Sequence, residues 1–341
     1  MADNILEVKD LNVEFDTYGG VVHAVRGVSY SLERGKTLAV VGESGCGKSV
    51  TVQSIMGLIP RPPGRITKGQ ALLGGIDLLA LPEKEARLYR GKEIGMIFQD
   101  AMSSLNPTMK IGKQIAETLV LHNGMSMDAA LKEAVRLLDL TRIPEAVKRI
   151  NQYPFEFSGG MLQRVMIAVA VACKPKVLIA DEPTTALDVT IQDQVLELMK
   201  DLQKEEGMSI ILITHDLGVV ARMADDVAVM YAGQVVETGT VEDVFYRSAH
   251  PYTLGLKQAM PSVDREDSRK LLPIAGTPPD LFNPPKGCSY AARCPVAKNI
   301  CSTKKVPSFS LKGTHKSSCW LQYEDAPEES SIDLFTNRGS E

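Results

Sequence analysis

A short glycine-rich run constrains the fold of this chain more than any other feature. Residues 42–49 read GESGCGKS, which fits the pattern G-x-x-x-x-G-K-[ST]. A continuous apolar run at 37–41 precedes it, and apolar residues follow at helical spacing from 49 to 58. The order strand, glycine-rich turn, helix predicts the phosphate-binding edge of a parallel α/β sheet.

This run has the chemistry of a nucleotide phosphate site. Its glycines let successive backbone N–H groups converge on phosphate oxygens, at the positive end of the helix dipole. The Lys48 ammonium can then reach the β- and γ-phosphates, and the Ser49 hydroxyl can ligate Mg²⁺. Cys46 stands at a variable position of the pattern, so we assign it no chemistry of its own. The expected nucleotide contacts are Gly42, Glu43, Ser44, Gly45, Cys46, Gly47, Lys48, Ser49 and Thr51.

Two adjacent carboxylates follow a second apolar run. Residues 177–180 are all apolar and place Asp181 at the carboxyl end of a buried strand, where α/β sheets bind ligands. Asp181 is predicted to hold Mg²⁺ and its waters. Glu182 is then free to polarise an attacking water, and a base positioned in this way contributes roughly 10²–10⁴ in rate.

Strand-forming runs lie on both sides of a helical insertion. The insertion is predicted at 111–140, where apolar residues recur at helical spacing. After it, helices alternate with strands, which indicates a parallel sheet with right-handed crossovers. Beyond about residue 250 the chain becomes rich in proline and cysteine. The predicted strands are 5–8, 11–15, a pair within 23–32, 177–180, 210–213 and 226–231.

Residues 157–164, FSGGMLQR, resemble the signature sequence of ABC-type ATPases, which is usually L-S-G-G-Q-x-Q-R. Further motifs of that family fall in the expected order: Gln99 as a Q-loop, residues 186–188 as a D-loop, and His215 as a switch histidine. The resemblance covers about residues 5–250. It implies a RecA-like parallel sheet core, an antiparallel β subdomain and a helical insertion.

The implied organisation places an ABC ATPase domain at 1–250, with its helical subdomain at about 101–170. A small, loop-rich C-terminal extension that binds a metal or cluster would occupy 251–323. Residues 324–341 are expected to form a disordered acidic tail.

The resemblance also implies roles for single residues. It assigns catalysis to Glu182, His215, Gln99 and Lys48. It assigns Mg²⁺ to Ser49, Gln99 and Asp181.

Other implied contacts reach a second subunit and the base of the nucleotide. Ser158, Gly159 and Gly160 would bind the nucleotide of a partner, although Met161 replaces the usual Gln. Asp188 of the D-loop is also placed among the nucleotide contacts. An aromatic residue of the N-terminal sheet would stack on adenine, with Tyr18 as first choice and Phe15 as second.

Several stretches resemble the ATPase subunits of bacterial oligopeptide and dipeptide permeases. These are FQD at 98–100 followed by SSLNP at 103–107, FSGGM at 157–161, and HPYT at 250–253. The resemblance implies ATP hydrolysis that powers peptide import, at the cytoplasmic face of the membrane as a peripheral subunit. The implied partners are a paralogous ATPase, two membrane-spanning permease subunits and, indirectly, an extracytoplasmic peptide-binding protein. Import of a non-peptide solute such as nickel is an alternative.

Charge and hydropathy argue against a protein that coats nucleic acid and against a membrane-spanning helix. The chain has 38 Lys+Arg against 42 Asp+Glu, so it lacks the basic excess of a protein that coats nucleic acid. Its longest apolar run, 165–173, is well under the roughly 18 residues that a membrane-spanning helix needs. A soluble ABC-type ATPase acting on nucleic acid or the ribosome remains an alternative, although the sequence has no heptad coiled coil and no second cassette.

Four of the six cysteines cluster near the C-terminus with the spacing C-x5-C-x6-C-x17-C. In a reducing compartment such a set indicates a shared metal more than a disulfide framework. Four cysteines suit zinc and a [4Fe–4S] cluster equally by ligand count. Resemblance to the cysteine extension of dipeptide-permease ATPases favours [4Fe–4S] in a structural role, with zinc second. A metal or redox module behind a degenerate cassette is a further alternative. The predicted ligands are Cys288, Cys294, Cys301 and Cys319.

Overall fold

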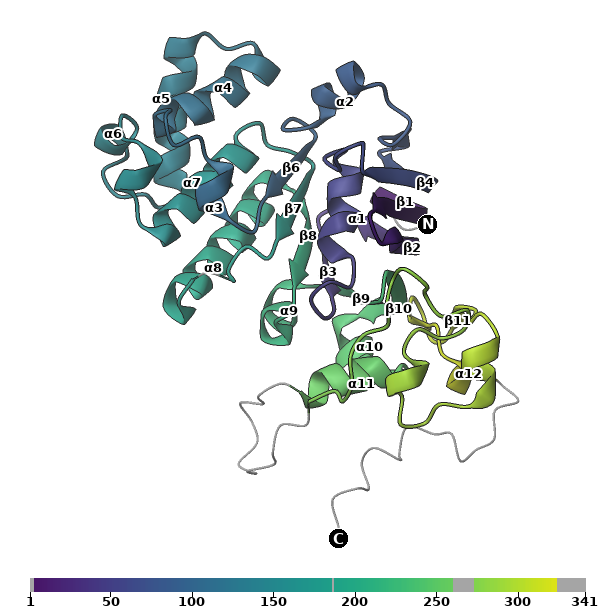
Figure 1. Cartoon of the computed structure of the whole chain (residues 1–341). Coiled ribbons are helices and arrows are strands. Elements are labelled where there is room, and N and C mark those ends of the chain that lie inside the picture. Colours follow the sequence, from purple (N-terminus) through teal and green to yellow (C-terminus); the bar gives the residue numbers. More distant parts are fainter. Residues whose placement is uncertain (1–2, 186, 260–272, 324–341) are drawn as a thin grey trace, which may run out of the picture.

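The computed structural model describes residues 3–185, 187–259 and 273–323, and its centre is a sheet of buried parallel strands (Figure 1). Both faces of these strands are covered, which explains why they are continuous apolar runs in the sequence. The sheet order is β11-β12-β10-β9-β3-β8-β7-β6. Its parallel strands are β3 (Thr37–Val41), β6 (Ile94–Ile97), β7 (Val177–Asp181), β8 (Ser209–Thr214) and β9 (Asp226–Tyr231).

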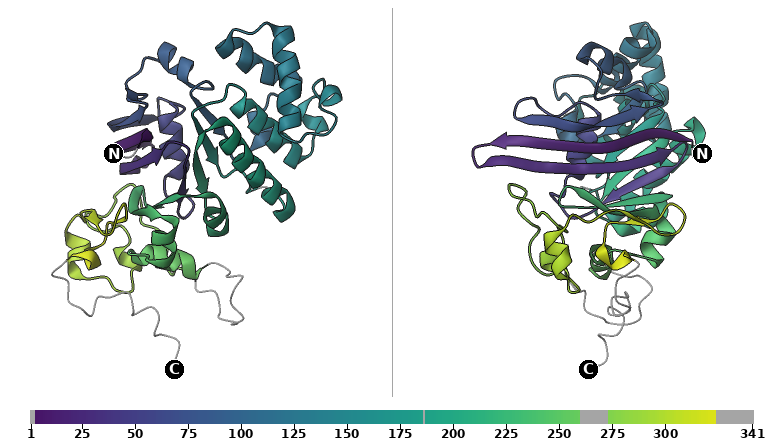
Figure 2. Two further views of the ribbon diagram at one scale, coloured as in Figure 1. Left: turned by 180° about the vertical axis from the view of Figure 1, so that it is seen from behind. Right: turned by 90° about the vertical axis from the view of Figure 1, so that its right-hand side faces the viewer.

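A second, antiparallel sheet lies beside the first, with the order β2-β1-β4-β5. Its strands are β1 (Asn4–Thr17), β2 (Gly20–Glu33), β4 (Gly64–Leu73) and β5 (Ile76–Asp77). Figure 2 shows β1 and β2 in its right-hand view as two long ribbons running side by side.

The sequence prediction of short strands at 5–8 and 11–15, and of a strand pair within 23–32, was wrong. β1 and β2 are each unbroken, and they pair antiparallel along their whole length. Their register shifts between Val8 and Leu11, and Asp10 there has a φ of 48°. Bulges of this kind interrupt the apolar alternation without ending the strand.

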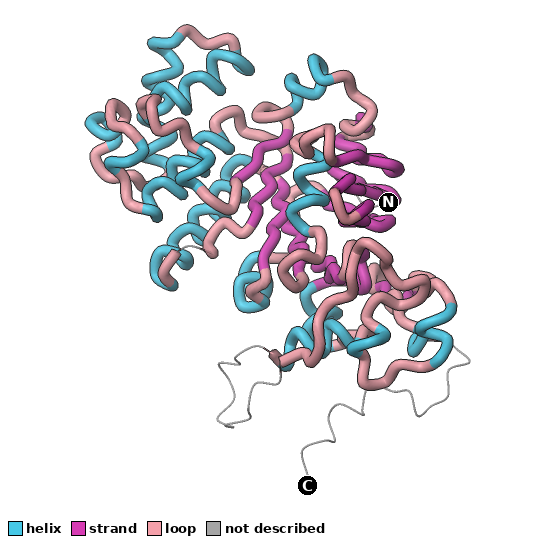
Figure 3. Tube along the Cα trace, in the orientation of Figure 1, coloured by secondary structure: helices cyan, strands magenta, loops and turns pink. Residues whose placement is uncertain are grey.

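Helices gather on the side of the parallel sheet that carries β6 (Figure 3). Ile111, Ile115 and Leu119 are buried on one of them, and Ala134 and Leu138 on the next, as the helical spacing predicts. These side chains share one hydrophobic core with the strand β7. The helices of this body are α3 (Ala101–Ser104), α4 (Ile111–Asn123), α5 (Met127–Leu140), α6 (Ala146–Arg149) and α7 (Gly159–Val171).

The remaining helices cover the sheets or belong to the C-terminal part of the chain. No helix in the described ranges is long and apolar enough to cross a membrane. These helices are α1 (Lys48–Ile55), α2 (Glu83–Tyr89), α8 (Val189–Glu206), α9 (Leu217–Met223), α10 (Val241–Tyr246), α11 (Pro251–Gln258) and α12 (Asn299–Thr303).

The C-terminal extension is joined to the parallel sheet by strand pairing. β10 (Gln234–Thr240) runs antiparallel to β9, and the short strands β12 (Lys316–Ser317) and β11 (Phe309–Ser310) continue beyond it. The expected tail at 324–341 lies outside the described residues.

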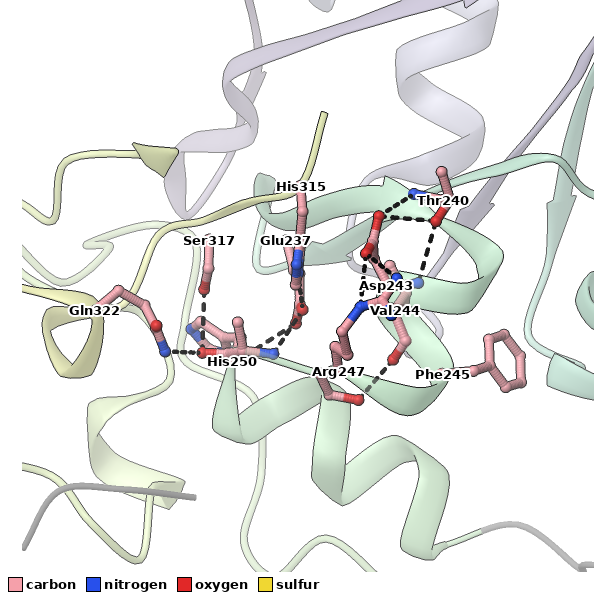
Figure 4. Close-up of polar contacts among 12 residues, drawn as sticks. Glu237, Thr240, Asp243, Val244, Phe245, Arg247, His250, His315, Ser317 and Gln322 are labelled. Carbon is pink, nitrogen blue, oxygen red and sulfur yellow. Dashed lines mark hydrogen bonds and ion pairs between the residues drawn. The ribbon is translucent and has the colours of Figure 1, made fainter. Parts of the chain in front are cut away.

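A buried polar joint reinforces this pairing (Figure 4). The Glu237 side chain on β10 accepts hydrogen bonds from the backbone N–H groups of Ala249 and His250, at 2.7 and 3.0 Å. His315 Nε2 lies 2.9 Å from the same carboxylate. Because both side chains are buried, this joint fixes the extension against the edge of the sheet.

Candidate nucleotide-binding and catalytic site

The glycine-rich loop runs from the end of β3 to the start of α1 and is confined by neighbouring backbone. A Cβ atom on Gly42 would lie 2.1 Å from the carbonyl oxygen of Met230. A Cβ on Gly47 would lie 2.5 Å from that of Ala24, and Gly47 also has a φ of 99°. Only glycine fits at either position, so the loop is held in one curled path.

The side chains after the loop bond back to its carbonyl groups. Lys48 Nζ is buried and donates to the carbonyl oxygens of Gly42 and Glu43, at 2.8 and 3.1 Å. The Thr51 hydroxyl is also buried and donates to Gly47 O at 2.8 Å. Thr51 therefore supports the first turn of α1, and its predicted contact with nucleotide stays a prediction. Burial raises the pKa of Cys46, whose sulfur lies 4.0 Å from Lys48 Nζ.

Ser49 and Asp181, two of the three predicted Mg²⁺ ligands, lie together, whereas the third, Gln99, contacts Glu182. The Ser49 hydroxyl donates to Asp181 Oδ1 at 2.9 Å. Burial raises the pKa of Asp181; the hydrogen bond from Ser49 opposes this rise, and the charge of Glu182 adds to it. A hydroxyl and a carboxylate at the carboxyl edge of the sheet are oxygen ligands of the type that Mg²⁺ prefers.

Glu182 lies at the centre of a second group of predicted residues. Its carboxylate accepts hydrogen bonds from Gln99 Nε2 at 3.2 Å and from the Thr185 hydroxyl at 3.0 Å. His215 Nδ1 lies 3.5 Å from the other carboxylate oxygen. Glu182 also has a φ of 48°, a strained conformation for a residue with a side chain. Backbone strain of this kind clusters at active sites.

The predicted contacts to a partner's nucleotide lie on a different part of the surface. Ser158 precedes α7 and is exposed, and its hydroxyl makes no capping bond. A Cβ on Gly160 would lie 2.8 Å from Ile191 of α8, so this glycine permits close packing of the two helices. Gly159 beside it is exposed. Among the described residues, no hydrogen bond joins this segment to the glycine-rich loop.

Asp188 of the expected D-loop begins α8, and its carboxylate accepts the backbone N–H of Ile191 at 3.0 Å. It is exposed at the end of the loop that follows Glu182. Ala186 of the same motif lies outside the described residues.

The two candidates for the adenine contact differ in exposure. Tyr18 lies in the turn between β1 and β2 and is fully exposed. Phe15 is partly buried and packs against the hydrophobic core beneath the antiparallel sheet. Tyr18 is thus the aromatic ring that is free to stack. Sequence reasoning missed Phe282 of the extension, whose ring lies 3.3 Å from the position of a Cβ on Gly19 in the same turn.

Sequence reasoning also missed a contact between the extension and the glycine-rich loop. Arg293 donates to both carboxylate oxygens of Glu43, at 2.7 and 3.0 Å. Tyr252 Oη accepts the backbone N–H of Glu43 at 2.9 Å. Arg293 belongs to no motif, so no signal in the sequence pointed to it.

The four C-terminal cysteines line one small cavity, and all are free thiols. However, no three His, Cys, Asp or Glu side chains in the described ranges form a group that could hold a metal ion. The expected metal-binding extension is therefore not shown. Burial raises the pKa of Cys294 to about 11 and that of Cys319 to about 12, so these thiols are protonated without a metal, and binding of one would release their protons.

The same cavity is lined by two ring N–H groups that lack partners. His250 Nδ1 accepts the backbone N–H of Tyr252 at 3.0 Å, so the neutral ring carries its proton on Nε2. Burial lowers the pKa of His250 to about 3, which keeps the ring neutral. Its Nε2 and the Trp320 Nε1 are both buried with no hydrogen-bond partner among the described residues. The residues around the cavity thus suit a guest that accepts hydrogen bonds.

Comparison with known proteins agrees with this arrangement. The family described as ABC transporter matches residues 25–185, and the oligopeptide/dipeptide transporter C-terminal region matches 236–301. The dimeric post-hydrolysis structure of the ATP-binding cassette MJ0796, bound to ADP and Pi, aligns with a TM-score of 0.62 at 27% identity. That alignment covers 69% of this chain and 98% of the cassette.

Two relatives extend the similarity over nearly the whole chain. The oligopeptide transport ATP-binding protein OppD of Bacillus subtilis (strain 168) is 60% identical over 95% of this chain and 90% of its own length. The dipeptide transport ATP-binding protein DppD of the same organism is 54% identical over 95% of this chain and 96% of its own length. The chain therefore belongs to the family of ATP-binding subunits of oligopeptide and dipeptide ABC transporters.

Proposed function

We propose that this chain is the ATP-hydrolysing subunit that powers import of oligopeptides or dipeptides through a membrane ABC transporter. The observation that carries the proposal is the catalytic group of Gln99, Glu182 and His215 beside the Ser49–Asp181 pair. The near full-length similarity to oligopeptide and dipeptide transport proteins supplies the cargo class.

The site divides the work of hydrolysis among its residues. The loop amides and Lys48 bind the phosphates of MgATP, and the oxygens of Ser49 and Asp181 bind its metal. The Glu182 carboxylate orients a water and takes its proton as the water attacks the γ-phosphorus. The bond from that phosphorus to the β–γ bridging oxygen breaks, which leaves ADP and phosphate. Gln99 and His215 hold Glu182 in place, which is supported by their contacts with its carboxylate.

The working unit we propose is a pair of ATPases, this chain and a paralogue, on two membrane-spanning permease subunits. Exposed Ser158 and Gly159 support this proposal, because they leave the signature segment open to a nucleotide held by another subunit. A peptide-binding protein outside the membrane would deliver the cargo. The chain would be peripheral, on the cytoplasmic face of the membrane.

The alternatives have less support. The match of residues 236–301 to the oligopeptide/dipeptide C-terminal region favours peptide over nickel. Action on nucleic acid or the ribosome has no observation in its favour.

Transport by the reconstituted complex tests the cargo class. The chain, its paralogue and the two permease subunits would be placed in liposomes with the binding protein outside. We expect uptake of labelled peptide that requires ATP inside and that ceases in Glu182→Gln. ATP-driven uptake of Ni²⁺ without peptide uptake would contradict the assignment.

We also infer that the cysteine cavity holds a [4Fe–4S] cluster in a structural role. Four free thiols surround one cavity, and the unpartnered His250 and Trp320 donors suit sulfur acceptors there. Zinc also takes four cysteine ligands and is the second choice. When bound, a cluster of this kind supplies folding free energy to a segment made of loops.

Anaerobic purification tests this inference directly. We expect brown protein with about four irons per chain, matching the four cysteine ligands. Colourless protein with one zinc would replace the cluster by the second choice, and protein without either metal would remove both.

A further inference from the structure

Glu43, the second residue of the glycine-rich loop, is paired with the C-terminal extension. Arg293 contacts both of its carboxylate oxygens in a bidentate arrangement, at 2.7 and 3.0 Å. The Arg293 side chain is only 5% exposed and that of Glu43 is 25% exposed. A desolvated bidentate pair of this kind is among the strongest polar contacts in proteins.

The extension fixes Arg293 before it reaches the loop. Its guanidinium donates to the carbonyl oxygens of Ala275 at 2.9 Å and Ile274 at 3.2 Å. It also lies 5.7 Å from the ring of Tyr231 and 6.0 Å from that of Tyr290, within the range of cation–π attraction. Arg293 is therefore a preorganised group rather than a mobile surface cation.

On the loop side, the same Glu43 is connected to the phosphate-binding lysine. Its carbonyl oxygen accepts Lys48 Nζ at 3.1 Å, and its backbone N–H donates to Tyr252 Oη at 2.9 Å. A free carboxylate here would repel the phosphates that the loop is built to receive. The motif places no requirement on the residue at this position. An acidic side chain here puts a negative charge beside the phosphate site, so a nearby cation is needed to offset that charge.

We propose that Arg293 is a positioning residue for ATP binding: by pairing with Glu43 it neutralises this carboxylate and holds the glycine-rich loop in its binding conformation. The proposal rests on the proposed function, in which residues 42–49 bind ATP. Arg293 directly precedes Cys294, so this pair also connects the cysteine cavity to the nucleotide site. The affinity of the ATPase domain for MgATP then depends on its C-terminal extension.

Titration of the full-length chain with a fluorescent ATP analogue and Mg²⁺ tests the proposal. We expect Arg293→Met to raise Kd by about ten- to a hundred-fold, because small displacements in a preorganised site have effects of this size. Arg26→Met is the matched control, since Arg26 also bridges to the extension, through Ser289 and the Pro285 carbonyl, without contacting Glu43. Its Kd should stay within about two-fold of wild type, a change near the noise of single-site effects.

A second substitution distinguishes two roles of Arg293, which are to neutralise Glu43 and to support the fold of the extension. Glu43→Gln in the Arg293→Met background removes the unbalanced charge and should restore most of the affinity. In the assembled transporter, Arg293→Met should raise KM for ATP and leave kcat nearly unchanged, since Arg293 does not touch the reacting atoms.

The possible results of these titrations distinguish failure of the proposed function from failure of the Arg293 inference. Failure of the wild-type chain to bind MgATP would overturn the proposed function itself. Normal wild-type binding with an unchanged Kd in Arg293→Met would overturn only this inference. Equal losses in Arg26→Met and Arg293→Met, without rescue by Glu43→Gln, would show that Arg293 merely supports the extension and would also overturn it.

Discussion

The catalytic site and the cysteine cavity both gather polar groups, but their groups are satisfied in different ways. At the catalytic site Ser49 is bonded to Asp181, and Gln99 is bonded to Glu182. In the cavity, the ring N–H of His250 has no partner among the described residues. A buried donor without a partner costs about 1–3 kcal/mol. The catalytic site is thus preorganised by the chain alone, whereas the cavity keeps an unpartnered donor that the proposed guest would satisfy.

The two regions also differ in what supports them. Catalytic groups follow the ends of buried parallel strands, so the sheet fixes them. The cavity is built from loops and short helices, which strand pairing and long-range side-chain contacts join to the ATPase domain. Two of these are the buried Glu237–His315 joint and the Glu43–Arg293 pair. We therefore expect catalytic substitutions to change rate with little loss of structure, and cavity substitutions to do the reverse.

Glu182→Gln should have the largest effect and should change only the rate. Loss of the base is expected to lower kcat about 10²–10⁴-fold, because the amide cannot take a proton from water. MgATP binding should be retained, and the ATP-bound cassette dimer should accumulate in size-exclusion chromatography. The control is Glu197→Gln on the exposed face of α8. Normal turnover in Glu182→Gln would remove Glu182 as the base.

Cys319→Ser should have the next largest effect and should change structure rather than rate. Loss of one thiol is expected to release the iron of the proposed cluster and to lower protection from hydrogen exchange in residues 273–323 by about 1–3 kcal/mol. Strand β3 should keep its protection. Cys173→Ser is the matched control, because Cys173 lies in the helical body and not in the cavity. Unchanged iron content in Cys319→Ser would show that this thiol does not hold a guest in the cavity, which would contradict the difference drawn between the two regions.

Sequence predictions were strongest where one physical requirement sets several residues at once. The strands that end at Val41 and Asp181 were recognised because burial on both faces makes them apolar runs. The glycine-rich loop was recognised because close backbone and a positive φ leave only glycine possible at Gly47. The catalytic role of Gln99 was implied by the family motifs and by no local pattern.

Predictions failed where a contact depends on distant parts of the chain. Strand β10 and its pairing with β12 were not predicted, since β12 has only two residues and the two strands lie far apart in sequence. The Glu43–Arg293 pair joins residues 250 positions apart, and neither residue type is unusual in its surroundings. Long-range pairs of this kind become visible only once the fold is known.

Asp181→Asn should have a smaller effect than the two substitutions above. It measures how much the buried charge of Asp181 lowers the free energy of unfolding. Burial raises the pKa of Asp181, so its charged form destabilises the folded chain when no metal is bound. The neutral amide should raise the free energy of unfolding near neutral pH, because it removes the cost of burying the carboxylate charge. The difference should close as the pH falls through the raised pKa, because wild-type Asp181 then becomes neutral as well.

Thermal unfolding without Mg²⁺ across a pH series measures this difference. The control is Asp216→Asn at the start of α9, where asparagine caps a helix about as well as aspartate. Equal stability of Asp181→Asn and wild type at neutral pH would mean that the catalytic site carries no such cost.

The smallest expected effect lies where the extension meets the turn between β1 and β2, at the predicted adenine contact. Tyr18→Ala should raise Kd for MgATP about three- to ten-fold, the size of one aromatic stacking contact, while Tyr18→Phe should bind as wild type does. Phe282→Ala should have a weaker effect in the same direction, because its ring packs on Gly19 and so orders the turn that carries Tyr18. Binding of inorganic tripolyphosphate should change in neither variant, since it contacts the loop and has no base. A matching loss of tripolyphosphate binding would show that these rings act through the glycine-rich loop, and the extension would then support the phosphate site alone.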